Sequence, residues 1–296
     1  MKIVLIIATL LIISAVSFNA FVSYNIHHPQ RKPVLWTPLD YGMIYSDISF
    51  TSDGIKLKGW FIPNNNSNAT IIMAHGYGGN RANCLEYARF FHRAGYNVLL
   101  FDFRAHGESG GNWTSNGYYE SDDIIAAVDY IKTPKKLGPN RIGMLGISMG
   151  GKTAIIASAK TSDVKAIVAD SSPAGFIDSM DIKKRVKMRL KWAGIPDISF
   201  LVNEELVTFF SEFQTGINDE KGKAINYVES INTPILIIHG DKDEIAPLKD
   251  AYLLYEKARE TKSIWVAENA GHHEACRTHR AEYEEKVVKF FDEYLN

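Results

Sequence analysis

The hydrophobic pattern of the chain changes its period repeatedly after residue 43, and this predicts strands that alternate with helices. Apolar and polar residues alternate over 44–50 and 55–62, on either side of the turn sequence Ser52-Asp53-Gly54, which is typical of a β-hairpin. Short apolar runs of the buried-strand kind follow, separated by segments with helical spacing. The strands expected after the hairpin are 70–74, 96–101, 141–147, 164–169, 234–238 and 263–267, and the expected helices are 79–94, 122–131, 149–160, 247–259 and 278–294.

This alternation favours an α/β fold, in which a mostly parallel twisted sheet carries helices on both of its faces. The hairpin should add antiparallel strands at one edge. The alternation breaks at about 171–233, where the pattern is largely helical, richer in charge and without a strand-like run. We therefore expect one domain over 31–296 that carries a helical insertion at about 171–233.

The first thirty residues follow a different pattern. Sixteen of the twenty residues 3–22 are apolar, and no charged residue lies between Lys2 and Arg31. Twenty helical residues at about 1.5 Å each span the hydrocarbon core of a bilayer, which is about 30 Å thick. Residues 1–30 are therefore expected to be a transmembrane signal-anchor, because the apolar character continues beyond the small residues of Ala15-Val16-Ser17. A cleaved signal peptide and a buried N-terminal helix are the alternatives.

The location of the domain follows from this segment. The positive charges on its two sides, Lys2 on one and Arg31 with Lys32 on the other, nearly balance. A short N-terminus normally stays inside the cell, so we expect a single-pass, membrane-anchored protein whose large domain lies outside the cytoplasm. Cleavage would instead give a secreted protein.

Composition excludes several classes of function. The 296 residues contain 33 Lys and Arg against 34 Asp and Glu, so the formal net charge is −1. A general nucleic-acid-binding protein would need a basic excess, and we expect no nucleic-acid partner. The only cysteines, Cys84 and Cys276, lack CxxC spacing, which argues against a disulfide scaffold and a cysteine zinc site. No signal for an oligomeric state is present.

A candidate nucleophile lies where the expected strand 141–147 ends. The sequence Gly146-Ile147-Ser148-Met149-Gly150 has the form GxSxG, between a strand and a helix. A sharp strand-to-helix turn needs small residues on both sides of the serine, and it exposes the serine hydroxyl beyond the sheet. Catalytic groups of open α/β sheets collect at this carboxyl edge.

Two later strands end in residues that could activate a serine. The strand 234–238 leads into a segment with two carboxylates, Asp241 and Asp243, and the strand 263–267 leads to His272 and His273. A serine hydroxyl is a weak nucleophile at neutral pH and needs a general base, for which histidine is suited. A buried carboxylate then orients the imidazole and stabilises its charged form.

Donors for a developing oxyanion are expected at two other positions. The strand 70–74 ends in His75-Gly76-Tyr77-Gly78-Gly79. Acyl transfer places negative charge on a carbonyl oxygen, and fixed backbone N–H groups stabilise that charge. The N–H groups of Tyr77 and Met149 are the expected pair, and Met149 also begins a helix whose positive end favours an anion.

Over about residues 44–296 the chain resembles serine hydrolases of the α/β-hydrolase superfamily. The resemblance is closest to membrane-tethered or secreted esterase-like members, which are related to prolyl-oligopeptidase-type domains. Besides the GxSxG sequence, it rests on a loop of the form Asp-x-Arg-x-His-Gly-x-Ser at 102–109, on an acid loop over 239–247 and on a histidine loop at 270–272. The chain order Ser148, Asp243, His272 is also that of the superfamily.

The resemblance implies specific roles. The catalytic triad would be Ser148, His272 and Asp243, in preference to Asp241 or Asp170 as the acid and to His273 as the base. His75, His106 and His239 would brace loops, and Arg104 would pair with Asp102 beneath the site. The insertion would form a cap over the nucleophile. No metal and no organic cofactor would be required.

The expected activity is hydrolysis of a small-molecule carboxylic ester through an acyl-enzyme intermediate. A peptidase, amidase or thioesterase could use the same triad, and a non-catalytic membrane-tethered binding protein is a more remote alternative. The insertion also holds six cations between Lys183 and Lys191. They could form a solvated helix face or a surface against anionic lipid headgroups.

Overall fold

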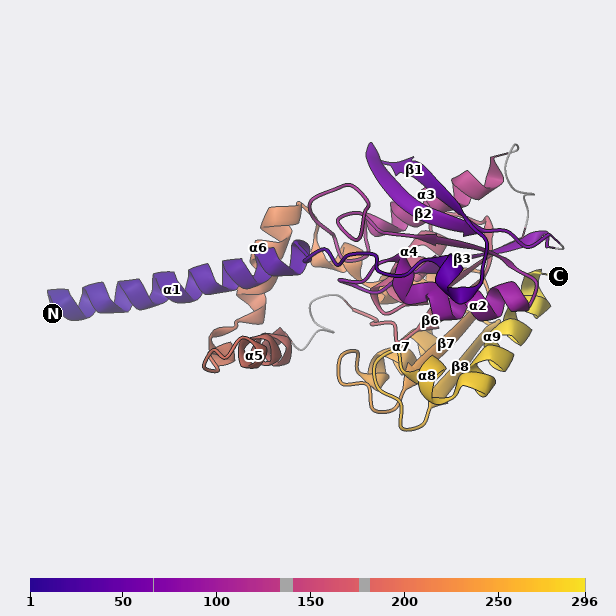
Figure 1. Cartoon of the computed structure of the whole chain (residues 1–296). Helices are drawn as coiled ribbons and strands as arrows, with labels where there is room; N and C mark the ends of the chain where they lie inside the picture. Colours follow the sequence, from indigo (N-terminus) through magenta and orange to yellow (C-terminus); the bar gives the residue numbers. More distant parts are fainter. Residues whose placement is uncertain (66, 134–140, 176–181, 296) are drawn as a thin grey trace.

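The computed structural model of the chain describes residues 1–65, 67–133, 141–175 and 182–295. Its centre is a sheet of eight strands in the order β1-β2-β4-β3-β5-β6-β7-β8 (Figure 1). The hairpin β1–β2 and the pair β2–β4 are antiparallel, and the other neighbouring strands are parallel. The predicted, mostly parallel sheet with an antiparallel hairpin at one edge is confirmed. The strands are Ser46–Ser52 (β1), Ile55–Ile62 (β2), Ala69–Ala74 (β3), Asn97–Phe101 (β4), Arg141–Ile147 (β5), Val164–Asp170 (β6), Ile235–Gly240 (β7) and Lys262–Ala267 (β8).

Helices cover both faces of this sheet, as the strand pattern predicts. Successive side chains of a strand point to opposite faces, so Ile72 of β3 packs into the apolar cluster that includes α3, α4 and α7, while Ile71 packs into the cluster that includes α2, α8 and α9. The α-helices are Lys2–His27 (α1), Leu85–Arg93 (α2), Glu120–Lys132 (α3), Met149–Ser158 (α4), Ile182–Trp192 (α5), Glu204–Thr215 (α6), Leu248–Lys257 (α7), Ala275–Thr278 (α8) and Arg280–Leu295 (α9). The 3₁₀ turns are Pro38–Tyr41 (η1), Arg81–Cys84 (η2), Ser199–Leu201 (η3), Asp219–Gly222 (η4), Ala224–Asn226 (η5) and Val228–Ser230 (η6).

The segment between β6 and β7 contains no strand within its described residues, 171–175 and 182–234. We call these residues the insertion; part of the predicted insertion, 176–181, lies outside the described residues. The insertion contains α5, η3, α6 and three further 3₁₀ turns. Figure 1 shows α5 and α6 beside α1, at the opposite side of the sheet from α9. The insertion therefore adds a helical layer at one end of the molecule.

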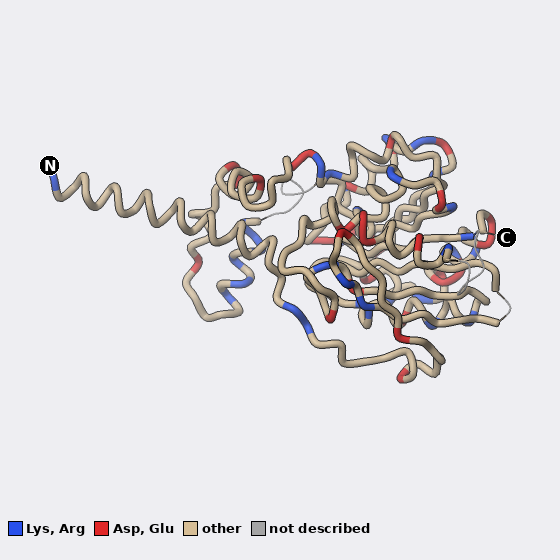
Figure 2. Tube along the Cα trace, turned by 90° about the horizontal axis from the view of Figure 1, so that it is seen from above, with Lys and Arg blue, Asp and Glu red and all other residues tan. Residues whose placement is uncertain are grey.

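Helix α1 is long and apolar enough to cross a membrane, by length and composition. It projects from the rest of the chain as a rod without charged residues after Lys2 (Figure 2). Its side chains are almost all exposed up to Ser17. From Phe18 onward one side of the helix, with Asn19, Val22, Ser23 and His27, is buried, whereas Phe21 and Tyr24 stay exposed. One helix thus has two environments, a free apolar end and a docked end.

Candidate active site

Ser148 lies in the sharp turn between β5 and α4. Its backbone has φ 56° and ψ −117°, a strained conformation for a residue with a side chain. A Cβ atom added to Gly146 would lie 2.2 Å from the carbonyl oxygen of Gly150, and one added to Gly150 would lie 2.1 Å from that of Ala74. Only glycine fits at both positions, so the GxSxG sequence permits the turn that exposes Ser148.

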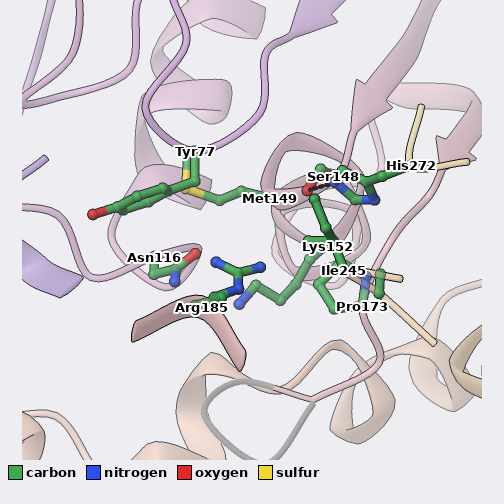
Figure 3. A pocket seen from close by; sticks show the side chains of 10 residues that line it. Tyr77, Asn116, Ser148, Met149, Lys152, Pro173, Arg185, Ile245 and His272 are labelled. Carbon is green, nitrogen blue, oxygen red and sulfur yellow. Dashed lines mark hydrogen bonds between the residues drawn. The ribbon is translucent and has the colours of Figure 1, made fainter. Parts of the chain in front are cut away.

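Three loops at the carboxyl edge of the sheet bring together the serine, the histidine and the aspartate. The Ser148 Oγ atom lies 2.9 Å from His272 Nε2 (Figure 3). His272 Nδ1 lies 2.7 Å from the Asp243 carboxylate. With its proton on Nδ1, the imidazole donates to Asp243 and accepts from the serine hydroxyl. This is the arrangement in which a histidine can take the proton of a serine that attacks a carbonyl group.

The environment of Asp243 keeps it ionised. Its side chain is fully buried, and one carboxylate oxygen accepts hydrogen bonds from the N–H groups of Ile245 (2.8 Å) and Ala246 (2.9 Å). Burial alone would raise the pKa of Asp243, but the hydrogen bond from His272 and those from the two N–H groups outweigh burial and lower it. A permanent negative charge therefore faces the imidazole.

The alternative acids and base have other surroundings. Asp170 accepts hydrogen bonds from the hydroxyl groups of Ser171 (2.9 Å) and Tyr283 (2.8 Å), and burial raises its pKa. Asp241 lies in the turn after β7, and the ring of His273 packs on that of His272 with centroids 5.2 Å apart. Of the candidate acids and bases, only Asp243 and His272 form a hydrogen-bonded chain with Ser148.

The two expected oxyanion donors lie beside Ser148. A Cβ atom added to Gly76 would be 3.4 Å from the Ser148 Cβ atom, so the loop after β3 runs directly against the serine. Tyr77 and Met149 line the same pocket as Ser148 and His272. Neither of their backbone N–H groups donates to an acceptor within the described part of the chain. Both donors are therefore free to bind an oxygen atom.

Comparison with known proteins identifies the family. The profile of the prolyl oligopeptidase family matches residues 86–296, more than half of the chain. The chain belongs to this family.

Relatives and solved structures agree with that placement. YqkD of Bacillus subtilis, described as uncharacterized, is 33% identical over 242 residues, which are 81% of this chain and 76% of YqkD. The α/β hydrolase domain-containing protein WAV2 of Arabidopsis thaliana is 27% identical over 231 residues, 75% of this chain and 69% of WAV2. The esterase Pf2001 of Pyrococcus furiosus superposes with a TM-score of 0.74 at 31% identity, over 92% of this chain and 99% of Pf2001. The expected α/β-hydrolase fold is confirmed, and the protein is an α/β serine hydrolase of the prolyl oligopeptidase family.

In this family member the pocket at Ser148 lies between the carboxyl edge of the sheet and the insertion. Two cations line it: Lys152, one turn beyond Ser148 in α4, and Arg185 of α5 (Figure 3). Burial lowers the pKa of Arg185, and no carboxylate of the described residues forms an ion pair with it. Among the described residues, the lining is Tyr77, Asn116, Ser148, Met149, Lys152, Pro173, Arg185, Ile245, Ala246 and His272.

Sequence reasoning missed these two pocket cations. The position of Lys152, four residues after the nucleophile on the same helix, was a readable signal, because residues four apart lie on one helix face. Arg185 gave no such signal, because it is one of six cations over 183–191. Only the fold of the insertion shows which of the six lines the pocket. Both place positive charge beside the serine.

The remaining histidines brace loops, as expected. His75 accepts a hydrogen bond from the N–H group of Phe103 (3.1 Å) and donates to the carbonyl of Gly76 (2.8 Å). His106 lies 2.8 Å from the carbonyl oxygen of Arg104, and His239 lies 2.9 Å from that of Ala246. These bonds hold the loops that surround Ser148.

The expected ion pair between Arg104 and Asp102 is wrong. Arg104 pairs with Asp123 of α3 at 2.6 Å, and Asp102 pairs with Arg81 of η2. The chain turns after β4, so the two side chains reach different helices. Both ions are buried and paired, as buried charges must be, but their partners come from distant segments.

Proposed function

We propose that this serine hydrolase cleaves carboxylic esters through an acyl-enzyme intermediate. The observation that carries the proposal is the hydrogen-bonded chain from Ser148 Oγ through His272 to the Asp243 carboxylate, with distances of 2.9 Å and 2.7 Å. The similarity to the esterase Pf2001 favours an ester over other acyl substrates.

In the proposed reaction, Ser148 Oγ attacks the ester carbonyl while His272 Nε2 takes the serine proton. Asp243 stabilises the imidazolium that forms. The N–H groups of Tyr77 and Met149 bind the oxyanion, and the start of α4 adds its positive end at the same point. His272 then protonates the leaving alcohol, and a water molecule, activated by the same imidazole, hydrolyses the acyl-enzyme. These residues require no metal or organic cofactor for the reaction.

Substitution of the nucleophile tests this proposal. We expect Ser148→Ala to abolish hydrolysis of p-nitrophenyl butyrate and labelling by a fluorophosphonate probe, with an unchanged circular dichroism spectrum. Ser158→Ala, at the far end of α4, is the matched control and should keep both activities. Turnover by Ser148→Ala at the wild-type rate would contradict the assignment.

A peptidase or amidase on the same residues is the second candidate, and the family name favours it. Ester and amide substrates with the same acyl group separate the two. We expect the ratio of kcat/KM for the ester to kcat/KM for the amide to exceed the ratio of the uncatalysed hydrolysis rates of the two substrates. A non-catalytic binding protein would react with neither substrate nor with the fluorophosphonate.

The proposal includes a location and a division of the chain. Residues 1–30 serve as a single-pass anchor, residues 31–296 form the catalytic domain outside the cytoplasm, and the insertion caps Ser148. The apolar rod of α1 and the contribution of Arg185 to the pocket support it. A secreted protein, cleaved after Ser17, is the alternative, and N-terminal sequencing of the mature protein separates the two.

A further inference from the structure

The insertion exposes large apolar side chains close to the point where α1 docks. Two of them, Phe209 and Phe213, stack on one face of α6, with ring centroids 6.5 Å apart, while the opposite face of α6 meets α1. We call the set the insertion face: Met188, Trp192, Ile195, Phe200, Phe209 and Phe213, whose exposed fractions range from 46% to 88%. A cluster of this kind marks a surface that meets a partner.

The docked end of α1 is tied to the insertion by polar groups. Asn19 donates to the carbonyl of Leu201 at 3.0 Å and accepts from the N–H of Asn203 at 2.8 Å. Eight residues later on the same helix face, His27 accepts from the hydroxyl of Ser211 at 2.7 Å. Because Asn19 and His27 are almost fully buried, these bonds hold α1 in one position on the insertion.

The linker that follows α1 is also fixed. The Arg31 guanidinium donates to the carbonyl groups of His106 (3.1 Å), Ser109 (2.5 Å) and Gly111 (2.6 Å). The loop that receives these bonds belongs to the catalytic domain. The domain therefore does not hang on a flexible tether, and the direction of α1 determines which face of the domain meets a membrane.

The length of α1 specifies how close that face must come. The exposed stretch, residues 3–17, has fifteen residues and extends about 22 Å. The hydrocarbon core of a bilayer is about 30 Å thick. If α1 spans the whole hydrocarbon core, the core must extend about 8 Å beyond Ser17. It then reaches the turns of α1 against which the insertion packs. Interfacial helices bury their apolar faces by about 5–10 Å, so the difference matches the depth of such contact.

The charge of the insertion selects the kind of surface. Of the six Lys and Arg residues over 183–191 of α5, Arg185 lines the pocket, and Lys184 and Lys187 form ion pairs with Glu244 and Asp197. The other three, Lys183, Arg189 and Lys191, are exposed, and Figure 2 shows positive charge on the segment beside α1. Cations at this level attract anionic headgroups, and tryptophan prefers the same interfacial zone. Trp192 is exposed at the end of α5, so the same helix carries both the cations and an interfacial aromatic residue.

We propose that the insertion face is seated in the headgroup region of an anionic lipid bilayer, with α1 as the transmembrane helix beside it. The proposal rests on α1 remaining as the anchor, and it is independent of the reaction that Ser148 performs. The bilayer removes the apolar side chains of the insertion face from water. The linker held by Arg31 keeps this face at the bilayer surface.

Depth-dependent fluorescence quenching tests this placement in the full-length protein. Phe213→Cys and Trp192→Cys, each labelled with the environment-sensitive fluorophore NBD, are reconstituted into nanodiscs of phosphatidylcholine and phosphatidylglycerol with brominated acyl chains. The native cysteines stay unlabelled because both are buried and burial raises their pKa to about 12. We expect both labels to be quenched and shifted to the blue.

Two further positions make the result decisive. Leu10→Cys in α1 should be quenched strongly, whereas Glu285→Cys, on the exposed side of the distant α9, should not be quenched. Unquenched labels at 213 and 192 beside a quenched label at 10 would overturn the proposal while leaving the anchor in place. An unquenched label at 10 would overturn the proposal together with the anchor. Fluorophosphonate labelling of Ser148 on the same samples reports separately on the hydrolase.

Discussion

The sheet with its loops and the pair formed by α1 and the insertion are stabilised in different ways. The sheet lies between two large apolar clusters, and its chemically important loops are fixed by backbone geometry. The insertion and α1 share one small cluster of buried residues, Val22, Ile182, Val202 and Val207, and polar contacts of Asn19 and His27 add to it. The first region holds Ser148, His272 and Asp243 within hydrogen-bonding distance of one another. In our proposal the second determines where the domain lies, and it contributes Arg185 to the pocket.

This difference predicts where the two regions tolerate substitution. Around Ser148 the backbone atoms approach so closely that a single methyl group does not fit. In the insertion, large side chains point into open space. Substitutions should therefore separate the regions by their effect on catalysis, on stability and on substrate preference.

The largest effect is expected for Asp243→Asn. Asparagine keeps the shape of the side chain but removes the negative charge and permits the wrong imidazole tautomer, so kcat should fall by a factor of about 10³–10⁴. Asp241→Asn, two residues away in the same loop, should change kcat little. Steady-state hydrolysis of p-nitrophenyl butyrate measures both. Equal losses in the two variants would show that the loop, and not the Asp243 charge, matters.

The next largest effect is on stability, and it compares one glycine substitution in each region. Gly150→Ala places a Cβ atom 2.1 Å from the carbonyl oxygen of Ala74, and we expect a destabilisation of more than about 3 kcal/mol. Gly194→Ala meets no atom within 4 Å, so only its left-handed conformation, with φ 69°, costs about 1 kcal/mol. Thermal unfolding of the two full-length variants in detergent measures the difference. Similar midpoints would remove the contrast.

The two regions also differ in how much the sequence reveals. The strand 141–147 and the turn at Ser148 are predictable because their signals are local: an apolar run, then glycines that the turn itself requires. The ion pairs of Arg104 and Arg81 are not, since each partner lies in another segment and only the folded chain selects it. The spacing of four between Asn19, Ser23 and His27 was visible, but its meaning depends on α6 lying opposite.

A smaller effect is a pH dependence of stability that comes from the catalytic region. Burial, reinforced by the neighbouring His106, lowers the pKa of His75 to about 3. Below about pH 6.5 the unfolded chain binds a proton that folded His75 does not, so stability falls by about 1.4 kcal/mol per pH unit as the pH decreases. His75→Gln, which keeps a donor and an acceptor, should lose this part of the slope. Denaturant midpoints at several pH values test it, and equal slopes for both proteins would contradict it.

The smallest expected effect concerns the one cation that α5 contributes to the pocket. Arg185 lies in the lining beside Ser148, so it should favour an acyl group that carries a negative charge. Mono-p-nitrophenyl succinate and p-nitrophenyl butyrate are similar in size and differ in that charge. We expect Arg185→Gln to lower the ratio of their kcat/KM values about tenfold, which corresponds to about 1.4 kcal/mol. Lys183→Gln, exposed on the same helix, should leave the ratio unchanged, whereas equal ratios in all three proteins would mean that the insertion does not select the substrate through Arg185.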